Sequence, residues 1–190
     1  MDAKQILAWF NMQANTAEGG YYESTYTSSV TVDKKCLQGF PSSSNQRPIC
    51  SAIYYFIDAD GFSAMHRVSS DMLYHFYSGD PVQMLLLYPP GSANKTQVNY
   101  FTNDLSAGGQ PMIVIPGGTW IGSRLVAGGQ YALMGVSMAP AFDPSDYEIG
   151  NRNQLIREYP EQAALIGELT RSTGVVKTPR ALARNGSAQR

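Results

Sequence analysis

Apolar and polar residues alternate in short runs along most of the chain, and Gly or Pro separates many of these runs. Residues 3–12 are predicted to form a short helix, because Ile6, Leu7 and Phe10 fall on one helical face. Strands are expected at residues 21–32, 49–57, 73–77, 82–88, 96–101, 112–115, 120–126 and 131–138. Many short strands with closely spaced turns indicate an all-β sandwich or barrel.

The pattern changes after Pro140. Residues 153–158 and 160–171 are typical of one or two helices, with Ala163, Ile166 and Leu169 among the apolar positions. A length of 190 residues fits one domain plus a tail, so we expect a single domain over residues 1–171. Residues 172–190 carry basic side chains among small polar ones, which predicts a disordered basic tail.

Composition narrows the classes of partner. Charged residues make up 15% of the chain and the net charge is -1, which gives no electrostatic case for binding nucleic acid or an anionic membrane. The sequence has no run of about 18 apolar residues and no leader of signal-peptide type at its start, so we expect a cytoplasmic protein without a spanning helix. Cys36 and Cys50 flank a loop and are expected to be free thiols, with a disulfide as the alternative.

Five segments carry a resemblance to a known family: residues 18–22, 51–56, 65–81, 116–120 and 139–148. Through them the chain resembles the cupin_5 family, also called DUF985, of RmlC-like jelly rolls, over about residues 5–171. The resemblance implies a cupin double-stranded β-helix (jelly roll) with a short N-terminal helix and one or two C-terminal helices. It also implies a pocket for a small-molecule ligand inside the barrel, and often a homodimer.

Many cupins hold a divalent metal through histidines and one carboxylate on neighbouring strands, which the resemblance allows us to check. If Gly79 is the closing glycine of the cupin pattern, His66 stands at the first histidine position. Val68, Met72 and Ile121 stand at the other three ligand positions, where they cannot serve as ligands. We therefore expect no metal and no cofactor. The remaining route to a metal would join His66 to carboxylates such as Glu23 or Asp143.

His66 is the candidate acid–base residue. A histidine near its ordinary pKa can move a proton at neutral pH. In epimerase-like cupins an Asp orients such a histidine and a Tyr lies opposite, which implies Asp143, or alternatively Asp146, as the orienting residue. We assign Tyr131 as the opposing phenol, with Tyr22, Tyr54 and Tyr74 as alternatives. A purely structural histidine in the barrel wall is the competing interpretation.

The expected pocket lining is largely apolar and aromatic. Side chains alternate between the two faces of a strand, so if position 72 faces the pocket then Tyr74 and Phe76 also face it, while His75 faces away. The full set of expected ligand-binding residues is Tyr22, Glu23, Tyr54, Phe56, Met72, Tyr74, Phe76, Trp120 and Ile121. The chain departs from the family at Thr16 and Ser24, which puts direct transfer of sugar-epimerase activity in doubt.

Three functions follow from these observations. The first is a metal-independent cupin enzyme of isomerase, epimerase or cyclase type that acts on a small organic molecule through His66. The second is a non-catalytic small-molecule binding protein with a retained ligand. The third is a metal-dependent cupin oxygenase. The N-terminal segment is expected to add to a neighbour's sheet edge in a homodimer.

Overall fold

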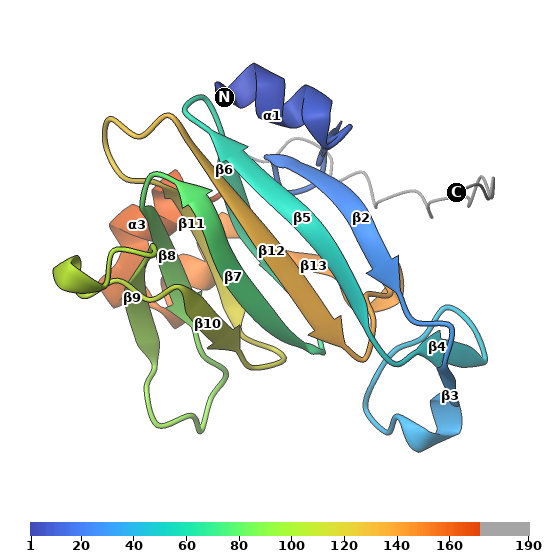
Figure 1. Ribbon diagram of the computed structural model, residues 1–190. Coiled ribbons are helices and arrows are strands. Elements are labelled where there is room, and N and C mark those ends of the chain that lie inside the picture. The colour runs from blue at the N-terminus through green and yellow to red at the C-terminus, as the bar shows by residue number, and fades with distance from the viewer. Residues whose placement is uncertain (172–190) are drawn as a thin grey trace.

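Two antiparallel sheets pack face to face in the computed structural model, which describes residues 1–171 (Figure 1). The six-stranded sheet runs, in spatial order, β1 (Gln13–Ala14), β2 (Tyr21–Thr27), β5 (Ser51–Asp58), β12 (Tyr131–Ala139), β7 (Asp71–Gly79) and β10 (Met112–Ile115). The five-stranded sheet runs β13 (Glu148–Ile149), β6 (Phe62–Arg67), β11 (Trp120–Leu125), β8 (Val82–Leu87) and β9 (Thr96–Phe101). Neighbouring strands are mostly not consecutive in sequence, as in a jelly roll.

Short helices cover the outer faces of both sheets (Figure 1). α1 (Ala3–Trp9) lies over one end of the six-stranded sheet, where Ile6 packs against Phe56 and Leu133. A capping box between Asp2 and Gln5 begins this helix. α2 (Arg152–Glu158) and α3 (Ala163–Glu168) cover the five-stranded sheet with an apolar cluster. The 3₁₀ turns are η1 (Lys34–Cys36), η2 (Leu105–Ala107), η3 (Pro144–Asp146) and η4 (Pro160–Gln162).

A small hairpin, β3 (Thr31–Asp33) and β4 (Gln46–Pro48), projects beside the barrel at the lower right of Figure 1. Its residue Arg47 is fully buried, since the guanidinium contacts Asp146, Ser70 and the carbonyl of Ala141. The hairpin therefore fixes the segment that leads from β12 to β13. This segment matters for the site, because it carries Tyr147.

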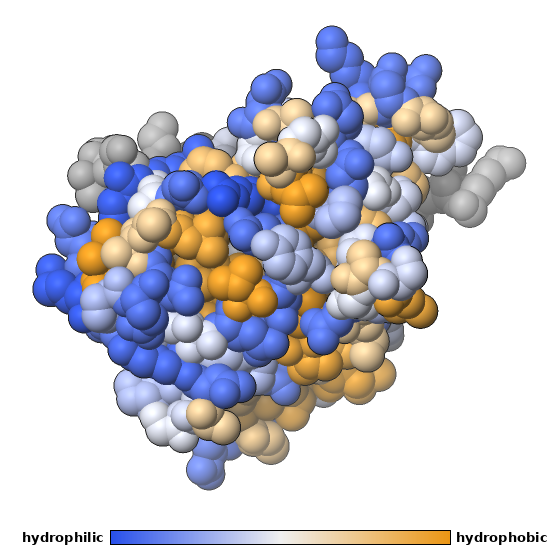
Figure 2. Space-filling view, turned by 90° about the vertical axis from the view of Figure 1, so that its left-hand side faces the viewer, coloured by the Kyte–Doolittle hydropathy of each residue, from blue (hydrophilic) through white to orange (hydrophobic). Residues whose placement is uncertain are grey.

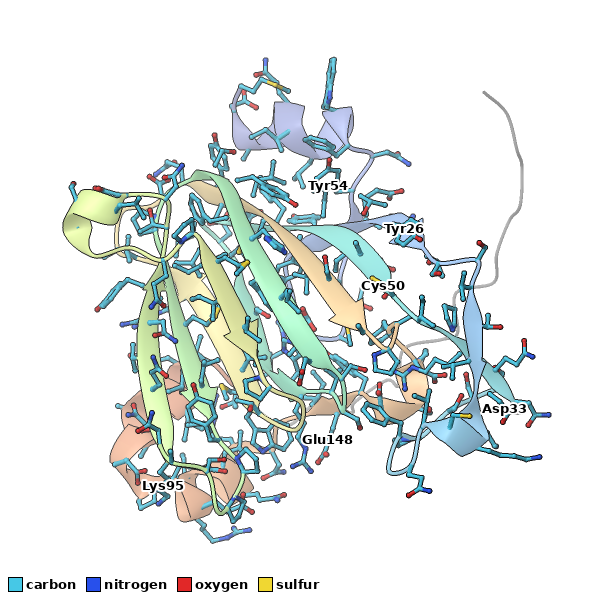
Figure 3. The ribbon with its side chains drawn as sticks, turned by 60° about the horizontal axis from the view of Figure 1, so that its bottom comes forward. Tyr26, Asp33, Cys50, Tyr54, Lys95 and Glu148 are labelled. Atoms are coloured by element: carbon cyan, nitrogen blue, oxygen red, sulfur yellow. The ribbon has the colours of Figure 1, made fainter. Side chains whose placement is uncertain are left out.

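The core lies between the two sheets and follows strand alternation. Tyr55 and Ile57 of β5 point inward, whereas Tyr54 and Phe56 point outward toward α1. Figure 3 shows Tyr54 on the α1 side of the sheet, where its ring centroid lies 4.6 Å from that of Phe10. The inward set also includes Val68, Met72, Tyr74, Phe76, Met84, Leu86, Phe101, Ile113, Ile115, Ile121, Met134, Val136 and Met138.

The all-β jelly roll with one N-terminal and two C-terminal helices is confirmed. The strand that carries His66, β6, is absent from the sequence prediction, because Phe-Ser-Ala-Met-His-Arg contains no β-branched residue and buries four consecutive residues. The strand predicted over residues 21–32 is divided into β2 and β3. The single-domain assignment stays a prediction, and the basic tail predicted at residues 172–190 lies outside the described residues. None of the described helices has the length and apolarity to cross a membrane.

Candidate functional site

His66 points from β6 into the space between the sheets, and only 3% of it is exposed. Its cross-strand partner is Ile121 of β11, which is also a core residue. The ring nitrogen Nδ1 lies 2.8 Å from the carbonyl oxygen of Ala64. Because a carbonyl can only accept a hydrogen bond, Nδ1 carries a proton, and in the neutral ring Nε2 is left with a lone pair.

Glu18 places a carboxylate opposite this nitrogen. Oε2 of Glu18 lies 3.5 Å from Nε2 of His66, and both residues are buried. The turn before β2 makes this approach possible: Gly19 has φ +105, and a Cβ there would lie 2.3 Å from the carbonyl oxygen of Phe62. Only glycine fits such a backbone. The amide of Ala64 donates to the Glu18 carbonyl, which ties the turn to β6.

The Glu18–His66 pair brings a ring nitrogen and a carboxylate oxygen to 3.5 Å from each other. Nε2 of a neutral ring and an ionised carboxylate oxygen are both acceptors, and they would repel each other in the buried space. One added proton removes the repulsion, either on Glu18 as the acid or on His66 as imidazolium. The pair is therefore a buried imidazole next to a carboxylate, two groups that commonly carry out acid–base chemistry.

Three phenols surround the pair. The Tyr147 hydroxyl donates to Oε2 of Glu18 at 2.9 Å, and its ring stacks on that of His66 with centroids 5.6 Å apart. The Tyr55 hydroxyl donates to the Gly19 carbonyl at 2.8 Å. Burial, followed by the negative charge of Glu18, raises the pKa of Tyr55, Tyr74 and Tyr147 above the ordinary value. All three phenols stay protonated at neutral pH and can donate hydrogen bonds.

Tyr147 depends on a buried ion pair for its position. Asp146, the preceding residue, accepts a hydrogen bond from Arg47 at 2.8 Å, and both side chains are almost fully buried. Burial raises the pKa of Asp146, although the Arg47 guanidinium opposes that shift. The second carboxylate oxygen, Oδ1, has no partner among residues 1–171. The pair anchors the segment that holds the Tyr147 ring against His66.

Asp143 does not reach His66. Its carboxylate accepts hydrogen bonds from the amides and hydroxyls of Ser43 and Ser145, where it caps η3. Burial raises the pKa of Asp143, but these hydrogen bonds outweigh burial and hold the pKa below the usual value. Glu18, instead of Asp143, faces the histidine.

The predicted lining residues divide between the interior and the outer faces. Tyr22, Met72, Tyr74, Phe76 and Ile121 lie in or against the interior cluster. Tyr54, Phe56 and Tyr131 lie in the outer cluster under α1, and Trp120 lies in the outer cluster under α2 and α3. Glu23 pairs with Tyr54 across the ladder and therefore shares its outer face. The reason is strand parity: in β5 the inward positions are the odd-numbered ones. Tyr131 and His66 are thus on different sides of the sheet.

A hollow was expected beside His66, where buried side chains of the interior cluster lie. Tyr55, Tyr74 and Met72 are all buried to within a few per cent. Hollows of about 270 and 220 Å³ lie on either side of Tyr88, and His66 lines neither of them. From solvent toward His66 the order of rings is Phe142, Tyr147, His66, with the half-exposed Phe142 edge-on to Tyr147.

The side chains at the site do not fit the metal centre of other cupins. Residues 1–171 contain no group of three or more His, Cys, Asp or Glu side chains placed to hold a metal ion. Glu18 and His66 offer one carboxylate oxygen and one nitrogen, and the cross-strand neighbour of His66 is Ile121. Two such ligands are too few for a stable transition-metal site.

Sequence reasoning misses Glu18, Tyr147 and Tyr55 as site residues. The chain pattern places Glu18 in the turn that ends the first helix, and it gives Tyr147 no role of its own. One feature of the sequence could have pointed to Glu18 and Tyr147. Both residues lie in motifs that carry the family resemblance, Glu18 in Glu18-Gly19-Gly20 and Tyr147 in the segment that ends at Glu148. A carboxylate directly before two glycines points to a backbone that brings it into close contact.

Two antiparallel sheets in jelly-roll order, with polar side chains directed between them, define a cupin barrel. The family comparison agrees, since the model described as Cupin superfamily (DUF985) matches residues 4–150. The chain belongs to this family.

Solved structures with the same fold extend over nearly the whole chain. A protein from Shewanella oneidensis is 25% identical, with a TM-score of 0.76 over 91% of this chain and 99% of its own. A hypothetical protein from Leishmania major is 24% identical, with a TM-score of 0.77 over 90% of this chain and 100% of its own. A cupin 2 domain-containing protein from Halorhodospira halophila is 12% identical with a TM-score of 0.52, over 82% of this chain and 86% of its own. No curated protein matches the sequence.

Proposed function

We propose that this cupin is a metal-independent enzyme that moves a proton on a small organic molecule, as an isomerase, epimerase or cyclase does. The observation that carries the proposal is the buried Glu18–His66 pair, whose facing atoms lie 3.5 Å apart. With the proton on His66, the carboxylate is a base and the imidazolium is an acid. A substrate that contacts both groups could lose a proton to Glu18 and gain one from His66.

Tyr147 takes the third role in this proposal. Its hydroxyl already donates to Glu18, and its ring covers His66 on the side of the half-exposed Phe142. A substrate must displace Tyr147 to reach the pair, and a carbonyl or hydroxyl oxygen of the substrate can then accept the hydrogen bond that Glu18 gives up. This replaces the assignment of Asp143 and Tyr131 to the orienting and opposing roles.

Exchange of carbon-bound hydrogen tests the proposal whichever of these reactions the enzyme catalyses. The protein is incubated in D₂O with a panel of small hydroxyketones and aldoses, and deuterium uptake is followed by NMR. We expect wild-type protein to catalyse uptake into at least one compound. Glu18→Gln and His66→Asn should slow it by about 10²–10⁴-fold, the usual contribution of a general acid or base. Glu148→Gln, at an exposed carboxylate, is the matched control.

Failure of every compound to exchange, or equal rates in wild type and both variants, contradicts the enzyme proposal. The alternative is then a non-catalytic small-molecule binding cupin. That alternative predicts a ligand that stays bound through purification and is unchanged on incubation. A metal-dependent oxygenase is the remaining alternative, and elemental analysis with clearly less than one metal per chain contradicts it.

The homodimer and the cytoplasmic location remain part of the proposal. Support for the dimer comes from the N-terminal end of the six-stranded sheet, where the two-residue strand β1 leaves an edge that a second copy can extend. Trp9 beside it is 76% exposed, which is unusual for a large aromatic residue outside an interface.

A further inference from the structure

A second group of polar side chains lies where the edges of the two sheets part. β9 ends the five-stranded sheet and β10 ends the six-stranded sheet, and the single bridge recorded between their ends joins Phe101 to Gln110. Between these edges a hollow of about 220 Å³ opens to the surface. Figure 2 views this side of the molecule, where apolar and polar side chains are interspersed.

Side-chain amides and one phenol line this hollow, and their hydrogen bonds form a series in which each group donates to the next. The Tyr88 hydroxyl donates to Oε1 of Gln97 at 2.8 Å, and Nε2 of Gln97 donates to Oδ1 of Asn99 at 2.7 Å. The chain therefore ends at the amide nitrogen of Asn99, for which residues 1–171 offer no acceptor. Asn99 is only 8% exposed and borders the hollow, as does Gln110. This nitrogen is free to donate a hydrogen bond to a ligand or to water in the hollow.

The lining favours an uncharged ligand. No charged side chain borders this hollow or the adjoining one of about 270 Å³ on the other side of Tyr88. A phosphate or carboxylate would bury its charge without a cation, and an ammonium group would bury its charge without an anion. In the adjoining hollow, the fully buried Thr119 hydroxyl also has no partner within residues 1–171, and Pro89 and Pro116 supply apolar surface.

The size of the hollows limits the ligand further. Pockets for drug-sized molecules enclose roughly 300–1,000 Å³, and each of these hollows is smaller. Amide groups donate and accept in equal measure, which matches hydroxyl groups, since each hydroxyl also does both. We propose that the β9–β10 seam binds an uncharged polyhydroxylated molecule of about monosaccharide size, held by Tyr88, Gln97, Asn99 and Gln110.

This site is separate from the Glu18–His66 pair. His66, Ile121, Leu86 and Gln97 pair in turn across four neighbouring strands of the five-stranded sheet. Three strand spacings of about 4.8 Å place His66 and Gln97 about 14 Å apart, with the apolar Ile121 and Leu86 between them. Binding of a ligand at the seam site is therefore independent of proton transfer at His66.

NMR of the side-chain amide groups tests the proposal directly. ¹⁵N-labelled protein is titrated to millimolar concentrations with the methyl α-glycosides of glucose, galactose and mannose, and then with glucuronate and glucosamine as charged probes. We expect at least one neutral glycoside to shift the amide signals of Asn99 and Gln97, and the charged probes to bind about tenfold or more weakly. Asn99→Leu should weaken binding of that glycoside about tenfold, as expected for one lost hydrogen bond.

Asn103→Leu makes the same chemical change at an exposed position just past β9 and should leave binding unchanged. If Asn99→Leu does not fold, Gln97→Met provides the equivalent test. The proposal is overturned if none of the glycosides shifts these amide signals, or if glucuronate or glucosamine binds as well as the neutral sugars. Shifts confined to residues around His66 would also overturn it, because they would place the sugar in the barrel interior.

Discussion

The Tyr147 hydroxyl donates a hydrogen bond to Glu18 at 2.9 Å, although the two residues are 129 positions apart in the sequence. The contact joins the turn before β2 to the segment before β13, and so closes the candidate site from two sides. A hydrogen bond to a buried carboxylate contributes more than one between neutral groups.

Glu18→Gln, Tyr147→Phe and the double variant measure this contact. We expect a coupling free energy of about 1–3 kcal/mol in urea unfolding, since both groups are buried and one is ionisable. The two single variants should each lower the free energy of unfolding, and the double variant should lower it by less than their sum. Strict additivity would mean that the hydrogen bond does not form in solution.

The proton on His66 can be located by ¹⁵N NMR of the imidazole ring. We expect Nδ1 to be protonated at neutral pH, because it lies 2.8 Å from the Ala64 carbonyl. Glu18→Gln should change the Nε2 signal strongly and leave Nδ1 protonated, because the glutamine amide can donate to Nε2 where the carboxylate could not. His75, the other histidine, is the internal control and should not respond. An Nδ1 that carries no proton contradicts this assignment.

Alkaline pH should destabilise the fold through its buried phenols. Burial and then the Glu18 charge raise the pKa of Tyr55 and Tyr74 above the ordinary 10.0. Below pH 10 the phenols are protonated in both the folded and unfolded states, so they add no pH dependence. Above it the unfolded chain loses protons that the folded chain keeps, and stability falls by up to ~1.4 kcal/mol per pH unit for each phenol.

Urea unfolding at increasing pH measures this slope. Tyr74→Phe should make the fall in the free energy of unfolding above pH 10 shallower, by up to ~1.4 kcal/mol per pH unit, because one buried phenol is removed. Tyr100→Phe, at an exposed ring, should leave the slope unchanged. Equal slopes in wild type and Tyr74→Phe would show that Tyr74 ionises freely in the folded protein.

Removal of Arg47 should be strongly destabilising. Arg47→Met leaves the Asp146 carboxylate buried without a cation, which costs about 3–5 kcal/mol. Arg47→Met combined with Asp146→Leu should recover much of this loss. The matched control is Arg67→Met, because the Arg67–Glu148 pair has a similar distance of 2.7 Å but is exposed, so about 0–1 kcal/mol is expected. Equal losses from the two arginine changes would contradict the buried pair.

The dimer can be tested at Trp9. Light scattering of the full chain at micromolar concentration should give twice the monomer mass, and Trp9→Glu should give a monomer because it places a charge in the interface. Leu105→Glu, at another exposed apolar residue, should remain dimeric. A monomer mass for the wild-type protein under these conditions would contradict the dimer proposal.

The site could be predicted only in part. Motif position and strand alternation identify His66, Met72, Tyr74 and Phe76, because an alternating pattern specifies which residues share a face. The same reasoning wrongly places Tyr54 and Phe56 inside, since β5 is apolar on both faces and its parity cannot be determined when one side is covered by α1. Tyr131 is misplaced for the same reason.

The sequence by itself determined an all-β sandwich or barrel with helices at its two ends, because periodicity and turn residues are local properties of the chain, and the motifs that resemble the cupin family narrowed this to a jelly roll. Only the tertiary structure decided that Glu18 and Tyr147 meet at His66, that Asp143 caps a turn instead, and that amides gather at the β9–β10 seam. These contacts join residues that are distant in sequence. Their geometry follows from how the sheets pack, which no local pattern records.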